Sequence, residues 1–406
     1  MDQPLVTVDD IRAARVLLEG VATRTPLEGS RPLSDAVGGP VLLKCENLQR
    51  TGSFKIRGAY VRIARLSPEV RAKGVVAASA GNHAQGVALA ARLLDTKATV
   101  FMPEGAPLPK VTATEAYGAE VRFHGATVDE ALTAAVAFAK EQGSTFIHPF
   151  DHFDIIAGQG TVGLEIVEQC PDVRTVVVCT GGGGLVSGVA AALKGLLPDV
   201  TIVAAQAEGA AAYPASLKAG HPVALSQMQT MADGIAVGSP GELTLAHVQK
   251  LVDRVDTVSD EQISRALLLC LERAKLVVEP AGAAALAAVS QDPKRFEPPV
   301  VVILSGGNID PLLLNKVISH GLVAAGRFLS LRVRVTDRPG QLAAILEILA
   351  NVGANVLEVS HTRTGIDLHL DEVDIAVELE TRGPTHCEQV LKALDDAGYD
   401  NVVSSY

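Results

Sequence analysis

The chain alternates short apolar runs with longer stretches in which apolar residues recur every three or four positions. The short runs predict strands and the longer stretches predict helices, so the alternation indicates a largely parallel sheet with helices on both faces. The expected strands are 40–45, 75–79, 98–102, 121–124, 145–148, 176–179, 202–205, 251–256 and 300–304. The expected helices are 8–20, one that begins at 55, one that ends at 94, 111–117, 128–142, 153–170, one that begins at 185, and 260–276.

Polar turns that contain glycine follow three of these predicted strands. They cover residues 80–86, 181–184 and 305–308. In an open α/β sheet, ligands bind at the edge formed by the carboxyl ends of the parallel strands. We therefore expect the three turns to face one shared site.

The pattern changes after Gly326, where a second and smaller unit is predicted. Its expected elements, in chain order, are strand 331–335, helix 341–352, strands 354–362 and 372–379, helix 385–397 and strand 401–404. This order is a βαββαβ unit of the ferredoxin type. We predict a two-lobed α/β catalytic part at 1–325, with a small lobe near 47–150, and a separate domain at 329–406.

Composition narrows the class of protein. Hydrophobic residues make up 48% of the chain and aromatic residues only 3%, which is typical of a soluble α/β protein built from small side chains. The formal net charge of −11 argues against a nucleic-acid partner. The five cysteines are scattered without a CxxC pair, which indicates reduced, buried thiols, and the acidic N-terminus lacks a signal pattern. These features predict a cytoplasmic protein.

An uncharged stretch at 175–193 is almost long enough to span a membrane. Four consecutive glycines interrupt it, so a short buried strand, a turn and a helix are the better interpretation.

Lys55 is the candidate for a nucleophilic amine. It stands between Phe54 and Ile56, just after a Thr-Gly-Ser turn and at the expected start of a helix. A lysine held among apolar groups loses hydration of its charged form, so its pKa falls and the neutral amine becomes available. Taken alone, the segment fits better a surface lysine whose stem covers apolar neighbours, which is the commoner case, and the glycine-bearing turns elsewhere in the chain favour the nucleophile.

The four-glycine turn is the candidate for an anion site. Glycines allow backbone N–H groups to approach a phosphate closely, and the positive end of the following helix adds to the attraction. The chain has no GxxxxGK[ST] motif, and its GxGxxG match at 158–163 lies in a predicted helix without a preceding strand. One small phosphate therefore fits better than a nucleotide. A reactive lysine, a glycine cup for one phosphate, and turns bearing Asn and Ser together describe a pyridoxal phosphate site.

Several ordered motifs resemble those of one enzyme family. They are SFKIRG at 53–58, SAGNHAQG at 79–86, AGQGT at 157–161, GGGGL at 181–185 and SGGN at 305–308. On these motifs the chain is similar to the fold-type II pyridoxal phosphate enzymes, whose two-lobed fold is that of the tryptophan synthase β-subunit. Within them it resembles the threonine dehydratases, also called threonine ammonia-lyases, over nearly its whole length.

The resemblance implies a role for each motif. Lys55 would hold the cofactor as a Schiff base and move the Cα proton, and Phe54 would pack against the cofactor ring, although core packing is an equal alternative for Phe54. Asn82 would bind the 3′ oxygen, although capping a helix is the commoner use of asparagine there. The residues implied to hold the phosphate and face the ring nitrogen are Gly181, Gly182, Gly183, Gly184, Leu185 and Ser305. Those implied to receive the substrate are Ser79, Ala80, Gly81, Asn82 and His83.

The implied reaction is β-elimination from L-threonine, and from L-serine, to give 2-oxobutanoate or pyruvate and ammonia. A serine hydroxyl at Ser305 cannot hold a proton on the ring nitrogen, which favours prompt loss of the β-hydroxyl. Related serine racemases carry a serine where Ala80 stands, and alanine cannot transfer a proton. The alternatives are a serine or threo-3-hydroxyaspartate dehydratase, a serine racemase, or an inactive amino-acid sensor.

No metal site is predicted. The metal-binding relatives carry a carboxylate where Gln206 stands, and Glu208 leaves the question open because hard cations prefer charged oxygen ligands.

The C-terminal unit resembles an ACT domain, a module that commonly binds an amino acid. The effector loop implied by this resemblance contains Asp337, Pro339, Gly340, Gln341 and Leu342. An ordinary strand-to-helix turn is the structural alternative for this segment. We expect isoleucine or valine as the effector and, because such modules usually pair, a homodimer or homotetramer.

Overall fold

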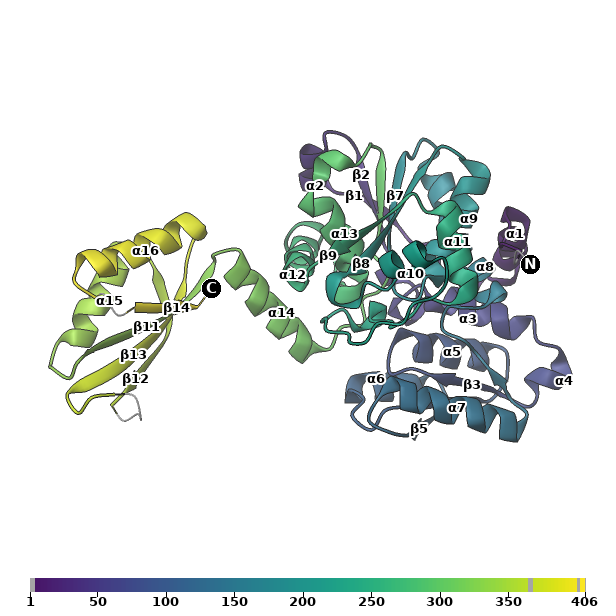
Figure 1. The fold of residues 1–406 in the computed structure, drawn as a ribbon, viewed down its shortest axis with the longest axis horizontal. Coiled ribbons are helices and arrows are strands. Elements are labelled where there is room, and N and C mark those ends of the chain that lie inside the picture. Colours follow the sequence, from purple (N-terminus) through teal and green to yellow (C-terminus); the bar gives the residue numbers. More distant parts are fainter. Residues whose placement is uncertain (1–3, 364–367, 400–401, 406) are drawn as a thin grey trace. The chain divides into compact units, whose positions relative to one another are not determined.

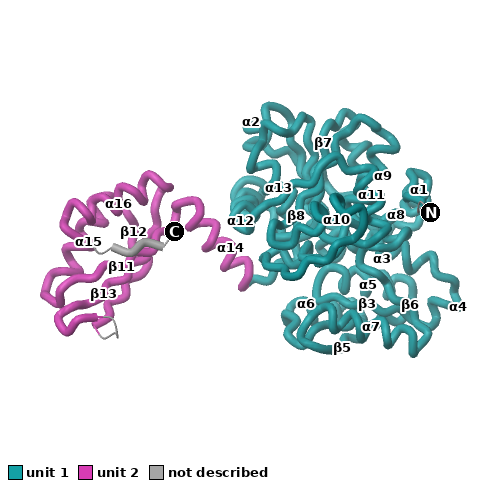
Figure 2. Tube along the Cα trace, viewed as in Figure 1, with its two compact units in different colours: residues 1–311 teal, residues 312–406 magenta. Residues whose placement is uncertain are grey.

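The computed structural model describes residues 4–363, 368–399 and 402–405 of the chain. Contacts divide the chain into two compact units, up to Pro311 and from Leu312 onward (Figure 2). The division thus falls after the first residue of helix α14 (Pro311–Ala324), whereas the sequence pattern placed the boundary after residue 325. The functional bounds of the two domains stay a prediction.

The larger sheet of the first unit has the strand order β1-β2-β10-β7-β8-β9, and Figure 1 labels all of these strands except β10. Its strands are β1 (Leu27–Gly29), β2 (Val41–Lys44), β7 (Thr175–Cys179), β8 (Thr201–Ala207), β9 (Arg254–Val258) and β10 (Val300–Ile303). Neighbours pair in parallel, except that β1 runs antiparallel to β2. The continuous apolar runs of β7 and β10 are buried along their whole length, as expected for strands covered on both faces.

The helices around this sheet are α1 (Val8–Leu17), α2 (Arg31–Val37), α8 (Phe153–Gln169), α9 (Gly184–Leu196), α10 (Tyr213–Ala219), α11 (Glu242–Leu251), α12 (Asp260–Leu269) and α13 (Pro280–Gln291). Helices α8 and α9 pack closely through glycines. A Cβ at Gly160 would lie 2.9 Å from the carbonyl oxygen of Gly188, and one at Gly188 would lie 2.3 Å from that of Ile156. The GxGxxG match at 158–163 thus serves helix packing, which agrees with our reading of it as a chance match to the nucleotide motif.

The smaller sheet of the first unit has the order β5-β4-β3-β6, and its strands are all parallel. Its strands are β3 (Val75–Ala78), β4 (Ala98–Met102), β5 (Glu120–Phe123) and β6 (Thr145–Phe146). The helices of this lobe are α3 (Lys55–Ala64), α4 (Pro68–Arg71), α5 (Asn82–Leu93), α6 (Leu108–Ala116) and α7 (Val128–Gln142). One hydrophobic core runs from α3, α5 and β3 to α1 and α8 of the large lobe.

The second unit is the predicted βαββαβ domain with α14 before it. Its further elements are β11 (Phe328–Thr336), α15 (Gln341–Asn351), β12 (Asn355–Thr362), β13 (Glu372–Glu380), α16 (Pro384–Asp396) and β14 (Val402–Ser405). The antiparallel sheet has the order β12-β13-β11-β14, which is the ferredoxin-like arrangement. Asn401, the predicted start of the last strand, lies outside the described residues.

Several predicted bounds were wrong, and the strand expected at 251–256 is one of them, because Leu251 still belongs to α11 and the strand runs from Arg254 to Val258. The helix expected at 260–276 ends at Leu269, where a π-helical turn (Cys270–Ala274) follows it. Lys275 then adopts φ +60°, a left-handed conformation that no helix continues. The helix after the four-glycine turn begins at Gly184 and not at Leu185.

The uncharged stretch at 175–193 forms β7, a turn and part of α9, as predicted. Within the described parts of the chain, no helix combines the length and the apolar character needed to cross a membrane. All five cysteines are free and buried, which confirms the expectation from their spacing.

Candidate active site

The turns singled out from the sequence come together in the first unit. Strands β2, β10 and β7 are neighbours, so the segments that follow their carboxyl ends share one edge of the large sheet. The backbone N–H of Phe54 donates to the carbonyl of Ser305 at 3.2 Å. Across the lobes, Asn308 Nδ2 donates to Asn82 Oδ1 at 2.8 Å, which joins the turn after β10 to the turn after β3.

Lys55 opens helix α3 at this meeting point. Its Nζ donates to the carbonyl of Pro149 at 3.0 Å and lies 5.3 Å from the centre of the Phe54 ring. Burial lowers the pKa of Lys55 to about 8, and the nearby carboxylate of Glu279 acts in the opposite direction. The Phe54 ring is partly buried and also packs against the core of the large lobe. Lys55 is therefore the desolvated lysine that the sequence predicted.

Asn82 is the first residue of helix α5, and its side chain does not cap that helix. Its amide is held at both ends, because Oδ1 accepts from Asn308 and Nδ2 donates to Glu279 Oε1 at 2.5 Å. His83, the next residue, is buried and its Nε2 lies 2.8 Å from the carbonyl oxygen of Ile147. Burial, helped by the charge of Lys55, lowers the pKa of His83 to about 3, so the ring is neutral. His83 thus lies in the core beneath the turn.

The substrate turn implied by the resemblance follows β3 directly. The N–H of Ser79 donates to the carbonyl of Phe101 at 3.1 Å, and Ser79 Oγ accepts the N–H of Gly81 at 3.1 Å. Ser79, Ala80 and Gly81 are partly exposed, and a Cβ added at Gly81 would meet no atom within 4 Å. The turn is therefore open on the side of Gly81, although the N–H groups of Ser79 and Gly81 already have acceptors.

The four-glycine turn links β7 to the N-terminus of α9. Gly183 has φ +95°, and a Cβ there would lie 1.8 Å from the hydroxyl of Tyr213. A Cβ at Gly182 would lie 2.3 Å from the ring of Phe150, and Tyr213 donates to the carbonyl of Gly182 at 3.2 Å. No residue larger than glycine therefore fits along this turn. Because its residues have no side chains, the backbone of the turn can approach its neighbours, and any ligand, closely.

Ser305 lies in the segment that follows β10, and its side chain is buried, with only 4% of the residue exposed. Its hydroxyl contacts the thiol of Cys179, whose pKa burial raises to about 11. A buried neutral thiol and a serine hydroxyl give this position no carboxylate that could hold a proton on a ring nitrogen.

These residues fit pyridoxal phosphate. The glycine turn exposes only backbone where side chains would clash with Phe150 and Tyr213, and it lies at a helix N-terminus, where a phosphate is favoured. The Lys55 amine supplies the covalent anchor, and the Ser305 hydroxyl is a neutral partner for the ring nitrogen.

Sequence reasoning missed Glu279, which lies at the N-cap of α13 and is 4% exposed. Its backbone N–H donates to the carbonyl of Gly306 at 3.0 Å. The sequence signal was weak, namely an acidic residue directly before a Pro-Ala-Gly helix start. Pro149 and Phe150 were also missed, because neither carries a chemical group that marks a site.

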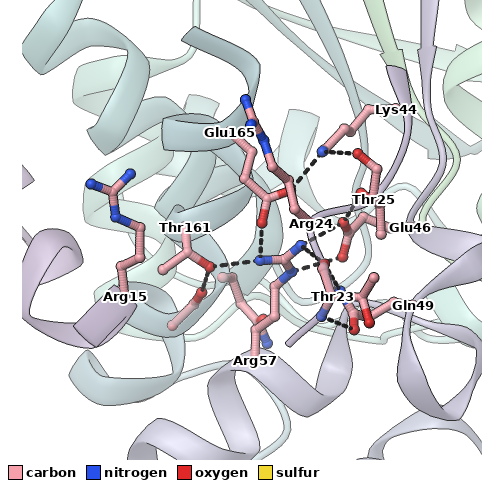
Figure 3. A network of polar contacts seen from close by, with 12 residues as sticks. Arg15, Thr23, Arg24, Thr25, Lys44, Glu46, Gln49, Arg57, Thr161 and Glu165 are labelled. Carbon is pink, nitrogen blue, oxygen red and sulfur yellow. Dashed lines mark hydrogen bonds and ion pairs between the residues drawn. The ribbon is translucent and has the colours of Figure 1, made fainter. Parts of the chain in front are cut away.

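A buried ion network anchors helix α3 behind the site (Figure 3). Arg57 donates to both oxygens of Glu46, at 2.9 and 2.8 Å, and to Glu165 Oε1 at 2.7 Å. Its remaining N–H groups reach Thr161 and the carbonyl of Thr23. Lys44 completes the network, with hydrogen bonds to Glu165 Oε2 at 2.6 Å, to the Thr25 carbonyl and to Gln169. The network ties the helix that carries Lys55 to α8 and to β2.

Gln206, considered above as a metal position, is buried. Its Oε1 accepts the N–H of Tyr213 at 3.1 Å, and its Nε2 has no hydrogen-bond partner. Glu208 is exposed. Over residues 4–363, 368–399 and 402–405, no group of three His, Cys, Asp or Glu side chains is placed to hold a metal ion.

The predicted effector loop lies in the second unit, between β11 and α15. Asp337, Pro339 and Gly340 are exposed, and Gln341 and Leu342 are partly buried. Gly340 has φ +96°, and an added Cβ there would meet none of the described residues within 4 Å, so the described part of the chain leaves the loop backbone open.

Comparisons with known proteins identify the family of the chain. The model of the family "Pyridoxal-phosphate dependent enzyme" matches residues 18–306, and that of the ACT domain matches residues 329–397. An L-threonine ammonia-lyase from Thermotoga maritima is 47% identical over 98% of this chain and 99% of its own length.

Solved structures give the same picture for the first unit. The processed form of threonine deaminase isoform 2 from Solanum lycopersicum has a TM-score of 0.74 and 39% identity, over 79% of this chain and 91% of that one. Maize serine racemase also has a TM-score of 0.74, with 37% identity over 79% of this chain and 99% of that one. The chain therefore belongs to the pyridoxal-phosphate dependent enzyme family, in the branch that holds the L-threonine ammonia-lyases, and carries a C-terminal ACT domain.

Proposed function

We propose that this protein is a pyridoxal-phosphate dependent lyase that converts L-threonine to 2-oxobutanoate and ammonia, and L-serine to pyruvate and ammonia. The proposal is supported by the match to an L-threonine ammonia-lyase along nearly the whole chain, together with the desolvated amine of Lys55.

The chain's residues take the following roles in this proposal. When bound, pyridoxal phosphate supplies the electron-withdrawing ring that makes the Cα proton of the amino acid acidic. Lys55 anchors the cofactor and, once released by substrate, accepts that proton, because about half of its amine is neutral near pH 8. Asn82 donates to the 3′ oxygen, Phe54 packs against the ring, and Ser305 faces the ring nitrogen.

The two backbone turns bind the anionic groups. Residues 181–185 hold the phosphate at the N-terminus of α9. Ser79 and the backbone of the turn before α5 receive the substrate carboxylate, which competes with Ser79 Oγ for the N–H of Gly81. These contacts orient the Cα–H bond toward Lys55 without a charged side chain.

Elimination is favoured over racemisation at this site. Racemisation needs a second acid or base on the opposite face of Cα, and the methyl group of Ala80 has no proton to give. Loss of the β-hydroxyl therefore follows removal of the Cα proton.

The experiment is the initial rate of 2-oxo acid formation from L-threonine by the purified enzyme, beside L-serine and threo-3-hydroxyaspartate. We expect the highest rate with threonine and none for the Lys55→Ala variant. A rate confined to hydroxyaspartate, or net formation of D-serine, would select the alternative enzymes. A K55A variant with normal turnover would refute the assignment of Lys55.

The ACT domain makes an amino-acid effector part of the proposal. We infer that isoleucine or valine binds at the loop that contains Asp337, Gly340 and Leu342, where the backbone around Gly340 is open. We also infer a homodimer or homotetramer, in which the effector changes activity by favouring one quaternary state.

A further inference from the structure

Glu279 is a buried carboxyl group to which the proposed function assigns no role. It is 4% exposed, and among the described residues its side chain accepts a hydrogen bond from the neutral amide of Asn82 and not from a cation. Burying a carboxyl group without a hydrogen bond from a cation is costly, so such groups are rare unless they serve a site.

The contact crosses between the two lobes of the first unit. Glu279 lies at the start of α13 in the large lobe, and Asn82 lies at the start of α5 in the small lobe. Gly306 makes room for the contact, because a Cβ there would lie 2.1 Å from Glu279 Oε1 and 3.1 Å from Asn82 Nδ2.

Asn82 is clamped in one orientation by this contact and by Asn308. Its Oδ1 accepts from Asn308 Nδ2, and its Nδ2 donates to Glu279 Oε1. Rotating the amide by half a turn would set two donors against each other at Asn308 and two acceptors against each other at Glu279. The clamp therefore leaves a defined Nδ2 hydrogen free for a ligand.

Glu279 also interacts electrostatically with charged groups from three further elements. Burial and the charge of Asp233 on η4 (Asp233–Ile235) raise the pKa of Glu279 to about 7, against the hydrogen bond from Asn82 and the charges of Lys110 on α6 and Lys55 on α3. In turn, the carboxylate of Glu279 raises the pKa of Lys55, against the lowering by burial.

We propose that Glu279 is a positioning residue of the active site, which holds the amide of Asn82 in one orientation across the lobes and supplies the negative charge that faces Lys55. The inference rests on the proposed function only in taking Asn82 and Lys55 as site residues.

The first test measures Lys55 and not catalysis. The full chain, freed of cofactor, is labelled with acetic anhydride from pH 6 to 10, and modification of Lys55 is followed by peptide mass spectrometry. In Glu279→Gln, which keeps the size of the side chain, the titration midpoint of Lys55 should fall by about one pH unit or more. Glu297→Gln, which removes one exposed carboxylate of the same unit, should leave it unchanged. An unchanged midpoint in E279Q would overturn the proposal.

The second test measures the clamp in the holoenzyme. Glu279→Ala should weaken the binding of pyridoxal phosphate by roughly 10- to 100-fold, because Asn82 loses a hydrogen bond to a charged group. E279Q, which can still accept from Asn82, should recover most of that loss. Equal cofactor affinity in wild type and E279A would contradict the positioning role.

The two tests separate this inference from the proposed function. If the wild-type protein is inactive on threonine but E279Q still shifts the midpoint of Lys55, the inference stands and the reaction is wrong. Active wild-type protein with no shift in E279Q and normal cofactor binding in E279A leaves the reaction standing and removes the inference.

Discussion

Arg57 shows how a single buried residue secures the site. Each of its N–H groups meets an acceptor, and both carboxylates that it contacts are themselves held by further donors. A buried ion network adds little to the free energy of unfolding compared with apolar residues of the same size. Removing one member, however, leaves the opposite charges buried without a partner, which is costly.

We predict that Arg57→Ala lowers the free energy of unfolding of the first unit by about 3–5 kcal/mol, because Glu46 and Glu165 would then share only the charge of Lys44. The measurement is the midpoint of urea unfolding, followed by circular dichroism. Arg12→Ala is the matched control, since the Arg12–Asp9 pair is exposed and such pairs contribute about 0–1 kcal/mol. Equal midpoints for the two variants would show that the network does not act as described.

Glu279 should give stability a distinct dependence on pH. Its pKa in the folded chain, about 7, exceeds the ordinary value of 4.5, so the folded state holds the proton more tightly than the unfolded state. The resulting stabilisation is complete below pH 4.5 and is lost as the pH rises through 7.

We therefore predict that the free energy of unfolding of Glu279→Gln, relative to wild type, rises between pH 5 and pH 8 by on the order of 3 kcal/mol. Chemical unfolding of both proteins, without cofactor, at the two pH values measures this difference. A constant difference would mean that Glu279 titrates normally in the folded chain.

At the scale of the element, the turn between β7 and α9 depends on glycine for steric reasons. Gly182 does not have a positive φ, so an alanine there is excluded by the Phe150 ring and not by backbone strain. The ring would have to move, and Phe150 adjoins Pro149, which accepts from Lys55.

We predict that Gly182→Ala weakens cofactor binding at least tenfold, because the added methyl group would displace either the Phe150 ring or the backbone of the turn. Titration of the cofactor-free protein with pyridoxal phosphate, followed by absorbance, gives the dissociation constant. Gly105→Ala is the control, since a Cβ at Gly105 meets nothing within 4 Å. Wild-type affinity in G182A would show that the turn has more room than this packing allows.

At the scale of the whole molecule, the chain joins a catalytic unit to an ACT domain that is complete in its own core. Buried residues of β11, β13, α15 and α16 form that core, and β13 alternates inward and outward side chains as a half-buried strand should. A regulatory role needs binding energy that differs between two states of the assembly.

We predict that isoleucine or valine lowers the rate with threonine in the full chain, with a sigmoidal dependence on substrate. Initial rates over a range of threonine concentrations, with and without each amino acid, test this. Gly340→Val should reduce the response without changing the basal rate, because a β-branched side chain is strained at φ +96° and reshapes the open loop. Unchanged rates and no binding of either amino acid by calorimetry would remove the effector proposal.

The sequence by itself determined the order and type of most elements, including the βαββαβ unit, because hydrophobic periodicity and glycine-bearing turns are local properties of the chain. It also pointed to Lys55, whose apolar neighbours in sequence already imply a desolvated amine. Helix ends were less certain, as the π-helical turn after Leu269 shows, because a helix stops where tertiary packing takes over its last turn.

Only the tertiary structure decided which residues stand around that lysine. The order β2-β10-β7 makes neighbours of segments that lie far apart in the chain, and Asn82 meets Glu279 across 197 positions. The same holds for Arg57 and Glu165, which are 108 positions apart. No local pattern encodes such pairs, because their contact arises from the packing of strands and helices and not from the residues beside them in sequence.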